Sequence, residues 1–299
     1  PSQADYFQTV KGGGHGDYRL IALAPASVQE MADFVGLAFD LAFKYRNPAI
    51  ILADGVIGQM MEKVVLPEQR PRLTNEEVMA RCPWATFGKL KHRGPNIVTS
   101  LELDPAEMEK RNIHLQQKYA EIEEKEVRYE EIHCDDAEYL IVAFGSCARI
   151  AQKAMEEARA EGIKVGLLRP ITLWPFPSKA IAERSRQVKG ILTVELNAGQ
   201  MVEDVRLAVE CKVPVEYFGR LGGIVPDPDE VVTALKEKLL NNKRMNTNLI
   251  RNILNIIFMV LALAAVLTYF FVSDFKVFIY VCAAAIFTKL IEFFLRFMC

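Results

Sequence analysis

The sequence of 299 residues is poor in the features that mark metal-binding, nucleic-acid-binding and secreted proteins. Its six cysteines form no C-x-x-C pair, and none stands at ligand spacing from a histidine. We therefore expect no metal site and no cysteine-ligated iron–sulfur cluster in this chain. Scattered cysteines favour a reducing compartment over a disulfide scaffold. The net charge of −2 gives no electrostatic reason to expect a nucleic-acid partner.

The start of the chain also lacks familiar signals. No initiator Met, charged n-region or apolar h-region accompanies Pro1, so we expect no secretory signal in the sequence as it stands. A start at Pro1 suggests a fragment.

Charge is unevenly distributed. Residues 245–299 hold only four of the 36 basic and two of the 38 acidic residues, which leaves a charge of −4 on the first 244. An ordinary, slightly acidic region is thus joined to a hydrophobic tail. By length, the whole chain corresponds to about two domains.

Residues 1–66 have an α/β pattern. An apolar run at 19–24 and another at 49–53 have strand length, and Asp54-Gly55 closes the second. Between them, Ser27 and Glu30 form a capping box ahead of a helix whose apolar residues recur at steps of three and four. Strand, helix and strand at this spacing predict one βαβ unit of a parallel sheet.

A glycine-rich motif, KGGGHGD, precedes this unit at residues 11–17. Such a loop can line a ligand or a subunit contact, or it can be a tight turn with a hydrogen-bonded histidine; both interpretations stay open. The motif lacks the G-x-x-x-x-G-K-[ST] pattern, so a phosphate-binding P-loop is not predicted.

Residues 67–136 are predicted to be a connector. Prolines are spread among charges, and Asp104, Pro105 and Glu107 then predict the start of a long helix. Its narrow apolar stripe, which can pack against one partner surface, comprises Met108, Leu115, Tyr119, Ile122 and Tyr129. An inter-domain arm is the favoured interpretation, with a ligand role as the alternative.

Residues 137–242 predict a second α/β domain with an open parallel sheet. Strands are expected at 139–144, 164–168, 191–195 and 215–218, and helices at 148–160, 178–188, from Gln200 and from Asp227. Ligands of such sheets usually lie beyond the carboxyl ends of the strands. The polar or glycine candidates there, which can equally have structural roles, are Gly145, Ser146, Arg169, Glu195 and Asn197.

Several segments resemble the alpha subunit of 2-oxoacid:ferredoxin oxidoreductases, most closely the 2-oxoisovalerate (3-methyl-2-oxobutanoate) type. The resemblance extends from Pro1 to about Leu240. The segments that carry it are PSQADYF (1–7), KGGGHGDYR (11–19), LAPASVQEM (23–31), ILADGVIGQMME (51–62), LLRPITLWPFP (167–177) and VELNAGQMVEDVR (194–206).

The resemblance implies a pyrimidine-binding thiamine-diphosphate domain, present only in its C-terminal part at 1–66, and a transketolase C-terminal-like domain at 137–242. It implies oxidative decarboxylation of a 2-oxoacid to an acyl-CoA, with ferredoxin as electron acceptor. Thiamine diphosphate and Mg are then expected mainly on a beta subunit, and iron–sulfur clusters on beta or ferredoxin-like partners beside a gamma subunit. CoA is the co-substrate.

Few site residues follow from the resemblance. The family's activating acidic residue and glycine-rich turn lie before Pro1, so we expect this chain to be inactive alone and assign it no catalytic residue. Ser2 and Gln3 correspond to the end of that turn, near the cofactor pocket, and His15 is the best polar candidate for the active-site rim. Structural roles for these three residues are the alternative.

The hydrophobic tail predicts a transmembrane helical hairpin at 249–298. The first span begins at Ile253 and ends at Val272 without a charge, which is long enough to cross a bilayer. A second, less apolar span runs from Val277 to Phe294. Basic residues before the first span place that end, and the soluble part, in the cytoplasm.

The tail is foreign to the family. It is a membrane anchor, a gene fusion or an artificial joining of two reading frames, and the sequence leaves these open. A catalytically silent, membrane-tethered interaction module is the alternative function.

Overall fold

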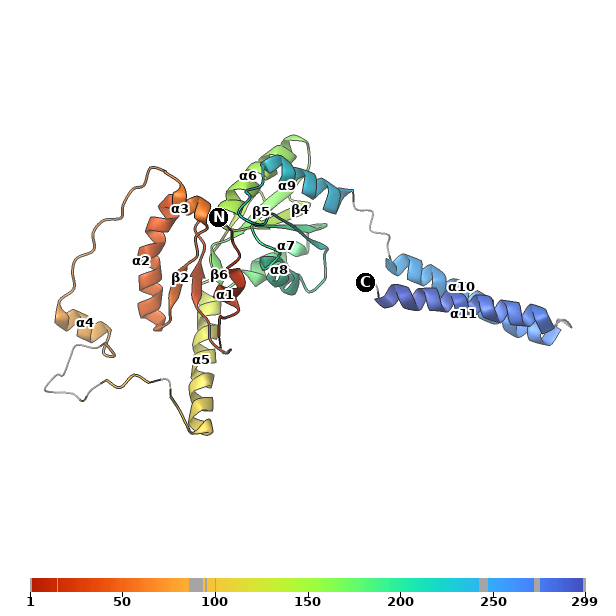
Figure 1. Cartoon of the computed structure of the whole chain (residues 1–299), viewed down its shortest axis with the longest axis horizontal. Coiled ribbons are helices and arrows are strands. Elements are labelled where there is room, and N and C mark those ends of the chain that lie inside the picture. The colour runs from red at the N-terminus through yellow and green to blue at the C-terminus, as the bar shows by residue number, and fades with distance from the viewer. Residues whose placement is uncertain are drawn as a thin grey trace. The chain divides into compact units, whose positions relative to one another are not determined.

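The computed structural model describes residues 2–14, 16–85, 94, 96–99, 101–241, 247–271 and 275–297. The chain divides into two compact units, Pro1–Leu239 and Leu240–Cys299 (Figure 1). The first unit is α/β, as predicted, and the second is helical.

The predicted βαβ unit is present in the first unit. Strands β1 (Ile21–Leu23) and β2 (Ala49–Ile51) pair in parallel, and helix α2 (Val28–Tyr45) connects them. Ser27 Oγ accepts a hydrogen bond from Glu30 N at 3.1 Å, as a helix cap should. The Glu30 carboxylate accepts from Ala26 N at 2.7 Å and not from Ser27 N, so the second half of the predicted capping box is wrong.

A strand from the later half of the chain completes this sheet. Strand β6 (Thr172–Trp174) pairs antiparallel with β1, which gives the order β2-β1-β6. Sequence reasoning placed no strand there, because three residues between two prolines carry no readable period. The sheet therefore joins segments that lie about 150 residues apart in the sequence.

The second sheet has the order β3-β5-β4-β7-β8. Four parallel strands confirm the predicted sheet: β4 (Tyr139–Ala143), β5 (Val165–Pro170), β7 (Ile191–Glu195) and β8 (Val215–Gly219). The antiparallel edge strand β3 (Tyr129–Ile132) was not predicted. Tyr129, assigned to the helical stripe, was thus misplaced, because helix α5 (Pro105–Lys125) ends four residues earlier. In β3, the backbone N–H and C=O groups of this segment hydrogen-bond to β5. At an exposed helix end, the same groups would lack protein partners.

Helices cover the second sheet in two pairs (Figure 1). Helices α6 (Gly145–Ala160) and α9 (Pro228–Leu235) pack together, as do α7 (Ser178–Ser185) and α8 (Met201–Val209). A π-helical turn, Lys236–Leu240, follows α9. Three shorter helices complete the first unit: α1 (Tyr6–Val10), α3 (Gly55–Gln59) and α4 (Asn75–Arg81).

The second unit consists of helices α10 (Thr247–Phe271) and α11 (Phe275–Phe297), which pack along each other. Among the described residues, one segment is long and apolar enough to cross a membrane, Asn252–Phe271 in α10. The predicted end of the first span, Val272, lies outside the described residues. Ile253, Val277 and Phe294 lie within the two helices.

The glycine at the start of α6 yields the first prediction. Gly145 has φ = +59°, and a β-carbon there would lie 2.7 Å from both Asp54 Oδ2 and Gln3 Nε2. Gly145→Ala should lower the free energy of unfolding through two effects that add. Left-handed backbone strain costs about 1–2 kcal/mol, and crowding of the new β-carbon costs about 1–3 kcal/mol. Chemical denaturation of the detergent-solubilised full chain measures the loss.

Gly162→Ala is the matched control. Gly162 also has positive φ, +87°, but has open space around its α-carbon. It should show the left-handed strain alone. Equal losses in the two variants would contradict the crowding that the structure shows at Gly145.

Candidate functional site

The N-terminal segment lies across the carboxyl ends of β4 and β7. Gln3 is bonded to Leu196 twice, once through its backbone and once through its side chain: Gln3 N donates to Leu196 O at 2.9 Å, and Leu196 N donates to Gln3 Oε1 at 3.2 Å. Its Nε2 donates to Phe144 O at 2.9 Å and to Asp54 Oδ2 at 3.2 Å. The Gln3 amide, 4% exposed, is thus fully engaged by protein.

Asp54 connects two helices at this point. Its Oδ1 accepts from Ile57 N at 3.1 Å, which caps α3, and its Oδ2 accepts from Ser146 N at 2.8 Å, in the first turn of α6. A carboxylate at a helix N-terminus is stabilised by the free amides and the helix dipole. This long-range cap explains why α6 starts at Gly145, three residues before the predicted start.

Glu195 and Asn197 organise the start of α8. The fully buried Glu195 carboxylate accepts hydrogen bonds from Met201 N at 2.7 Å and Val202 N at 2.9 Å. Burial raises the pKa of Glu195 despite these bonds. Asn197 Nδ2 donates to Gln3 O at 3.0 Å, and its Oδ1 accepts from Gly199 N at 2.8 Å. Both side chains serve the backbone of the described chain, which leaves neither placed as a general base.

Ser2 is exposed beside this network and lines a cavity of about 450 Å³, here named the Ser2 cavity. It lies beyond the ends of β7 and β8, where ligands of open α/β sheets usually bind. Backbone at Gly222 and Gly223, with φ of +65° and +87°, forms one side. The remaining lining residues are Ala4, Leu196, Asn197, Ala198, Gln200 and Leu221.

Gln200 connects the N-terminal segment to the start of α8. Its Oε1 accepts from Phe7 N at 2.8 Å, and its Nε2 donates to Ala4 O at 2.9 Å. The partners lie nearly 200 positions away, so no local signal could have revealed them. Gln200 holds the N-terminal segment against the wall of the Ser2 cavity.

Arg169 lies apart from the Ser2 cavity. Its two terminal nitrogens donate to the Glu30 carboxylate at 2.8 Å each, and Nε donates to Glu130 at 2.8 Å. Burial opposes ionisation of Glu30, but the hydrogen bonds from Arg169 and Ala26 N outweigh it and lower the pKa of Glu30. Arg169 therefore links α2, β3 and β5 and is not a member of the cavity.

The glycine-rich motif is described except at His15, which lies outside the described residues. Gly13 N donates to the Tyr18 hydroxyl at 2.7 Å, and Lys11 Nζ forms an ion pair with Asp204. These bonds fix both flanks of the motif. Gly13, Gly14 and Tyr18 line a second cavity of about 440 Å³.

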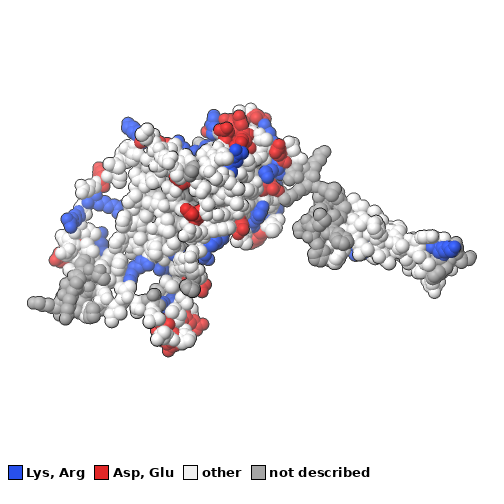
Figure 2. Space-filling model, in the orientation of Figure 1, with Lys and Arg blue, Asp and Glu red and all other residues white. Residues whose placement is uncertain are grey.

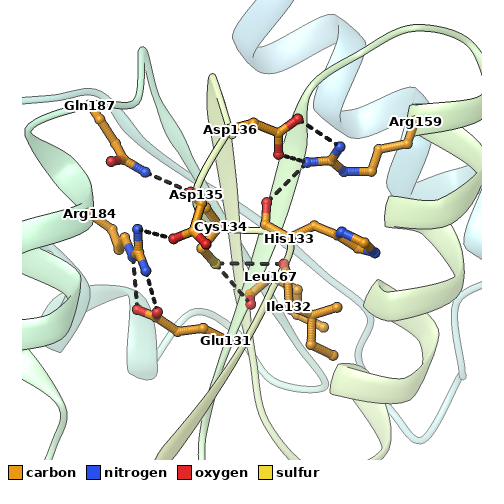
Figure 3. Close-up of polar contacts among 10 residues, drawn as sticks. All are labelled: Glu131, Ile132, His133, Cys134, Asp135, Asp136, Arg159, Leu167, Arg184 and Gln187. Atoms are coloured by element: carbon orange, nitrogen blue, oxygen red, sulfur yellow. Dashed lines mark hydrogen bonds and ion pairs between the residues drawn. The ribbon is translucent and has the colours of Figure 1, made fainter.

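The turn between β3 and β4 gathers several groups that could look catalytic (Figure 3). Arg184, from α7, donates to the Glu131 carboxylate at 3.0 and 2.6 Å and forms an ion pair with Asp135 at 3.1 Å. Arg159, from α6, pairs with Asp136 and donates to His133 O at 3.0 Å. The two arginines hold this turn between helices of opposite pairs, so the cluster is a structural junction.

Cys134 lies at the centre of that junction (Figure 3). Its thiol donates to Leu167 O at 3.3 Å, and burial raises its pKa to about 11. Thiolate is the reactive form, so Cys134 should resist iodoacetamide near pH 7.5 and react only as pH approaches 11. Peptide mass spectrometry of the native chain checks this, with the exposed Cys211 as an internal reference. Equal labelling of both at pH 7.5 would contradict the buried thiol.

The chain is an α/β protein with a cavity beyond the carboxyl ends of two sheet strands, and comparisons with known proteins specify the family. The family described as pyruvate flavodoxin/ferredoxin oxidoreductase, thiamine-diphosphate-binding, matches residues 1–131. Pyruvate:ferredoxin oxidoreductase core domain II matches residues 137–231. The two matches meet at the β3–β4 junction.

Curated relatives agree. The ketoisovalerate oxidoreductase subunit VorB of Methanothermobacter marburgensis is 49% identical over 237 residues, which are 79% of this chain and 65% of the relative. The 2-oxoglutarate synthase subunit KorA of the same organism is 32% identical over 254 residues, covering 78% of this chain and 68% of the relative. The chain thus spans somewhat less than two thirds of the length of the VorB relative.

A solved structure shares the fold. The 2-oxoglutarate:ferredoxin oxidoreductase from Magnetococcus marinus, with 2-oxoglutarate, coenzyme A and succinyl-CoA bound, has a TM-score of 0.63 at 22% identity. The match covers 80% of this chain and 45% of that one. The chain belongs to the family of 2-oxoacid:ferredoxin oxidoreductase subunits, as its sequence resemblance predicts.

Proposed function

We propose that this chain is the alpha subunit of a thiamine-dependent oxidoreductase that converts 2-oxoisovalerate to an acyl-CoA and passes electrons to ferredoxin. The proposed substrate class rests on sequence identity. The chain is 49% identical to a ketoisovalerate oxidoreductase subunit and 32% identical to a 2-oxoglutarate synthase subunit. Both relatives come from one organism, so the difference in sequence identity does not arise from comparing proteins of different organisms.

The chemistry of the Ser2 cavity suits part of the cofactor. Its polar groups are a hydroxyl, amides and glycine backbone, which can hydrogen-bond a neutral heteroaromatic ring. The described residues contain no group of three metal-ligating side chains. We therefore assign the diphosphate and Mg mainly to a beta subunit. Thiamine diphosphate, when bound, supplies the carbanion chemistry.

Within this chain, each proposed cofactor-binding residue has a different task. Ser2 lines the cavity, whereas Gln3 anchors the adjacent backbone through its hydrogen bonds to Leu196. His15 is proposed for the rim on the strength of the family resemblance. None of the three is assigned proton transfer.

The remaining partners follow from what the chain does not encode. The sequence has no C-x-x-C pair to ligate clusters, so iron–sulfur clusters are assigned to beta or ferredoxin-like subunits, with a gamma subunit completing the complex. CoA is the proposed co-substrate. We place the first unit in the cytoplasm and the apolar second unit in a lipid bilayer.

Substrate choice is tested on the chain carrying the family's N-terminal segment ahead of Pro1 and co-expressed with beta, gamma and ferredoxin-like subunits. Ferredoxin reduction should require a 2-oxoacid and CoA, and kcat/KM for 2-oxoisovalerate should exceed that for 2-oxoglutarate about tenfold or more, since a site built for an apolar chain leaves a carboxylate unpaired. A preference for 2-oxoglutarate contradicts the substrate assignment. Co-purification without turnover on any 2-oxoacid supports the silent, membrane-tethered module instead.

The same complex tests the cavity. Ser2→Trp should fill the Ser2 cavity and raise the concentration of thiamine diphosphate needed for half-maximal activity. Ser178→Trp, an equally exposed serine that lines a different cavity, is the matched control and should leave that concentration unchanged. Equal behaviour of the two variants would remove Ser2 from the cofactor site.

A further inference from the structure

The second unit has its polarity inverted relative to a water-soluble helical pair. Large apolar side chains point outward along both helices, and Figure 2 shows the described surface of this unit as almost free of charge. The first unit carries both charge signs on the face shown. Exposed apolar residues on α10 include Ile256, Met259, Val260, Leu263, Val266 and Phe270, and on α11 Ile279, Tyr280, Ile286 and Phe287.

Polar groups lie between the two helices. Lys289 Nζ, on α11, donates to Asn255 Oδ1 on α10 at 2.8 Å. It also pairs with Glu292 at 3.1 Å, three positions along its own helix, as the sequence spacing predicted. The Glu292 side chain is only 2% exposed. We name Asn255, Lys289 and Glu292 the polar lock.

The ring of Phe258 completes the surroundings of the lysine. Lys289 Nζ lies 5.5 Å from its centroid, within the range of a cation–π contact. An ion pair, an amide and an aromatic face thus contact the ammonium group, while the Lys289 side chain remains 46% exposed. Farther along the helices, Ala265 and Ala285 are buried, which lets the backbones approach closely, as in membrane helix pairs.

Water would favour the opposite arrangement. In a soluble hairpin, lysine and glutamate turn outward and apolar side chains fill the contact. In a bilayer, ionisable groups turn toward the neighbouring helix and pair there, while apolar side chains face lipid. The outward apolar side chains and the buried Glu292 therefore favour hydrocarbon over water as the surroundings of the two helices.

The position of Asn255 along α10 agrees with a place for the polar lock inside the bilayer. Asn255 precedes Phe271 by 16 positions, which is about 24 Å along a helix. The lock thus lies inside a hydrocarbon layer of about 30 Å, toward the side on which α10 begins.

We propose that the second unit crosses the bilayer twice and that the polar lock stabilises α11 in its membrane-spanning position. Helix α11 is 23 residues long and contains two ionisable side chains near its end, Lys289 and Glu292, which are costly to place in a bilayer. The hydrogen bond from Lys289 on α11 to Asn255 on α10 offsets part of the cost of placing the polar side chains of α11 in the bilayer. Insertion of α11 therefore depends on α10. This inference rests on the membrane placement proposed above and on the hairpin that the sequence predicts, and it adds the residues responsible for the second span.

The test uses the full chain in sealed membrane vesicles that expose the first unit. A carbonate wash should leave the chain in the membrane. A membrane-impermeant maleimide should then label Cys211, in the first unit, and Cys299, at the chain end, from the same side. Cys299→Ser identifies the second label.

Two single variants isolate the lock. Asn255→Leu removes the interhelical bond and should raise the share of chains whose Cys299 is protected, about threefold for one such bond. Asn252→Leu makes the same chemical change three positions away, outside the lock, and should behave like the unchanged chain.

Each failure is distinguishable. Release by carbonate overturns the membrane placement itself. Retention with Cys299 protected in the unchanged chain overturns the two-span hairpin but leaves a single span. Identical Cys299 labelling in Asn255→Leu and Asn252→Leu overturns the role of the lock. None of these outcomes alters the substrate test, which reads ferredoxin reduction.

Discussion

Hydrogen bonds from Gln3 and Asp54 hold the first unit together at the carboxyl end of its larger sheet. Gln3 bonds the backbone at Leu196, after β7, and at Phe144, after β4, while Asp54 caps α3 and α6. All these groups are buried, where an unpartnered polar atom costs about 1–3 kcal/mol. Removing one member would leave several others unpaired, so the network constrains the N-terminal segment and the turn after β7, which both line the Ser2 cavity.

The same hydrogen bonds account for how the proposal distributes cofactor and metal binding among the subunits of the complex. The carboxylates of Asp54 and Glu195 are occupied by helix amides, and the Cys134 thiol is buried at a structural junction. The chain therefore offers neutral hydrogen-bonding groups along the Ser2 cavity, which is consistent with the proposal that partner subunits bind the metal and diphosphate and transfer the electrons. A family whose activity needs several subunits can place its site at such a wall.

Local patterns predicted much of this fold. Apolar periodicity and the Ser27 cap located the βαβ unit, and four parallel strands of the second sheet followed from short apolar runs. Strands β3 and β6 escaped because their stability comes from pairing with β5 and β1, far along the chain. Ser2, Gln3, Asn197 and Glu195 could be named as candidates, but that residue 3 bonds residues 54, 144 and 196 could not be read from any spacing.

The most direct test of this account is a double-mutant cycle between Gln3 and Asp54 on the detergent-solubilised full chain. Gln3→Ala, Asp54→Ala and the double variant give three free energies of unfolding by chemical denaturation. The account predicts a coupling of about 0.5–3 kcal/mol, whereas Gln3→Ala with the distant Gln29→Ala should be additive within about 0.5 kcal/mol. Additivity between Gln3 and Asp54 would contradict the claim that these two residues form one network.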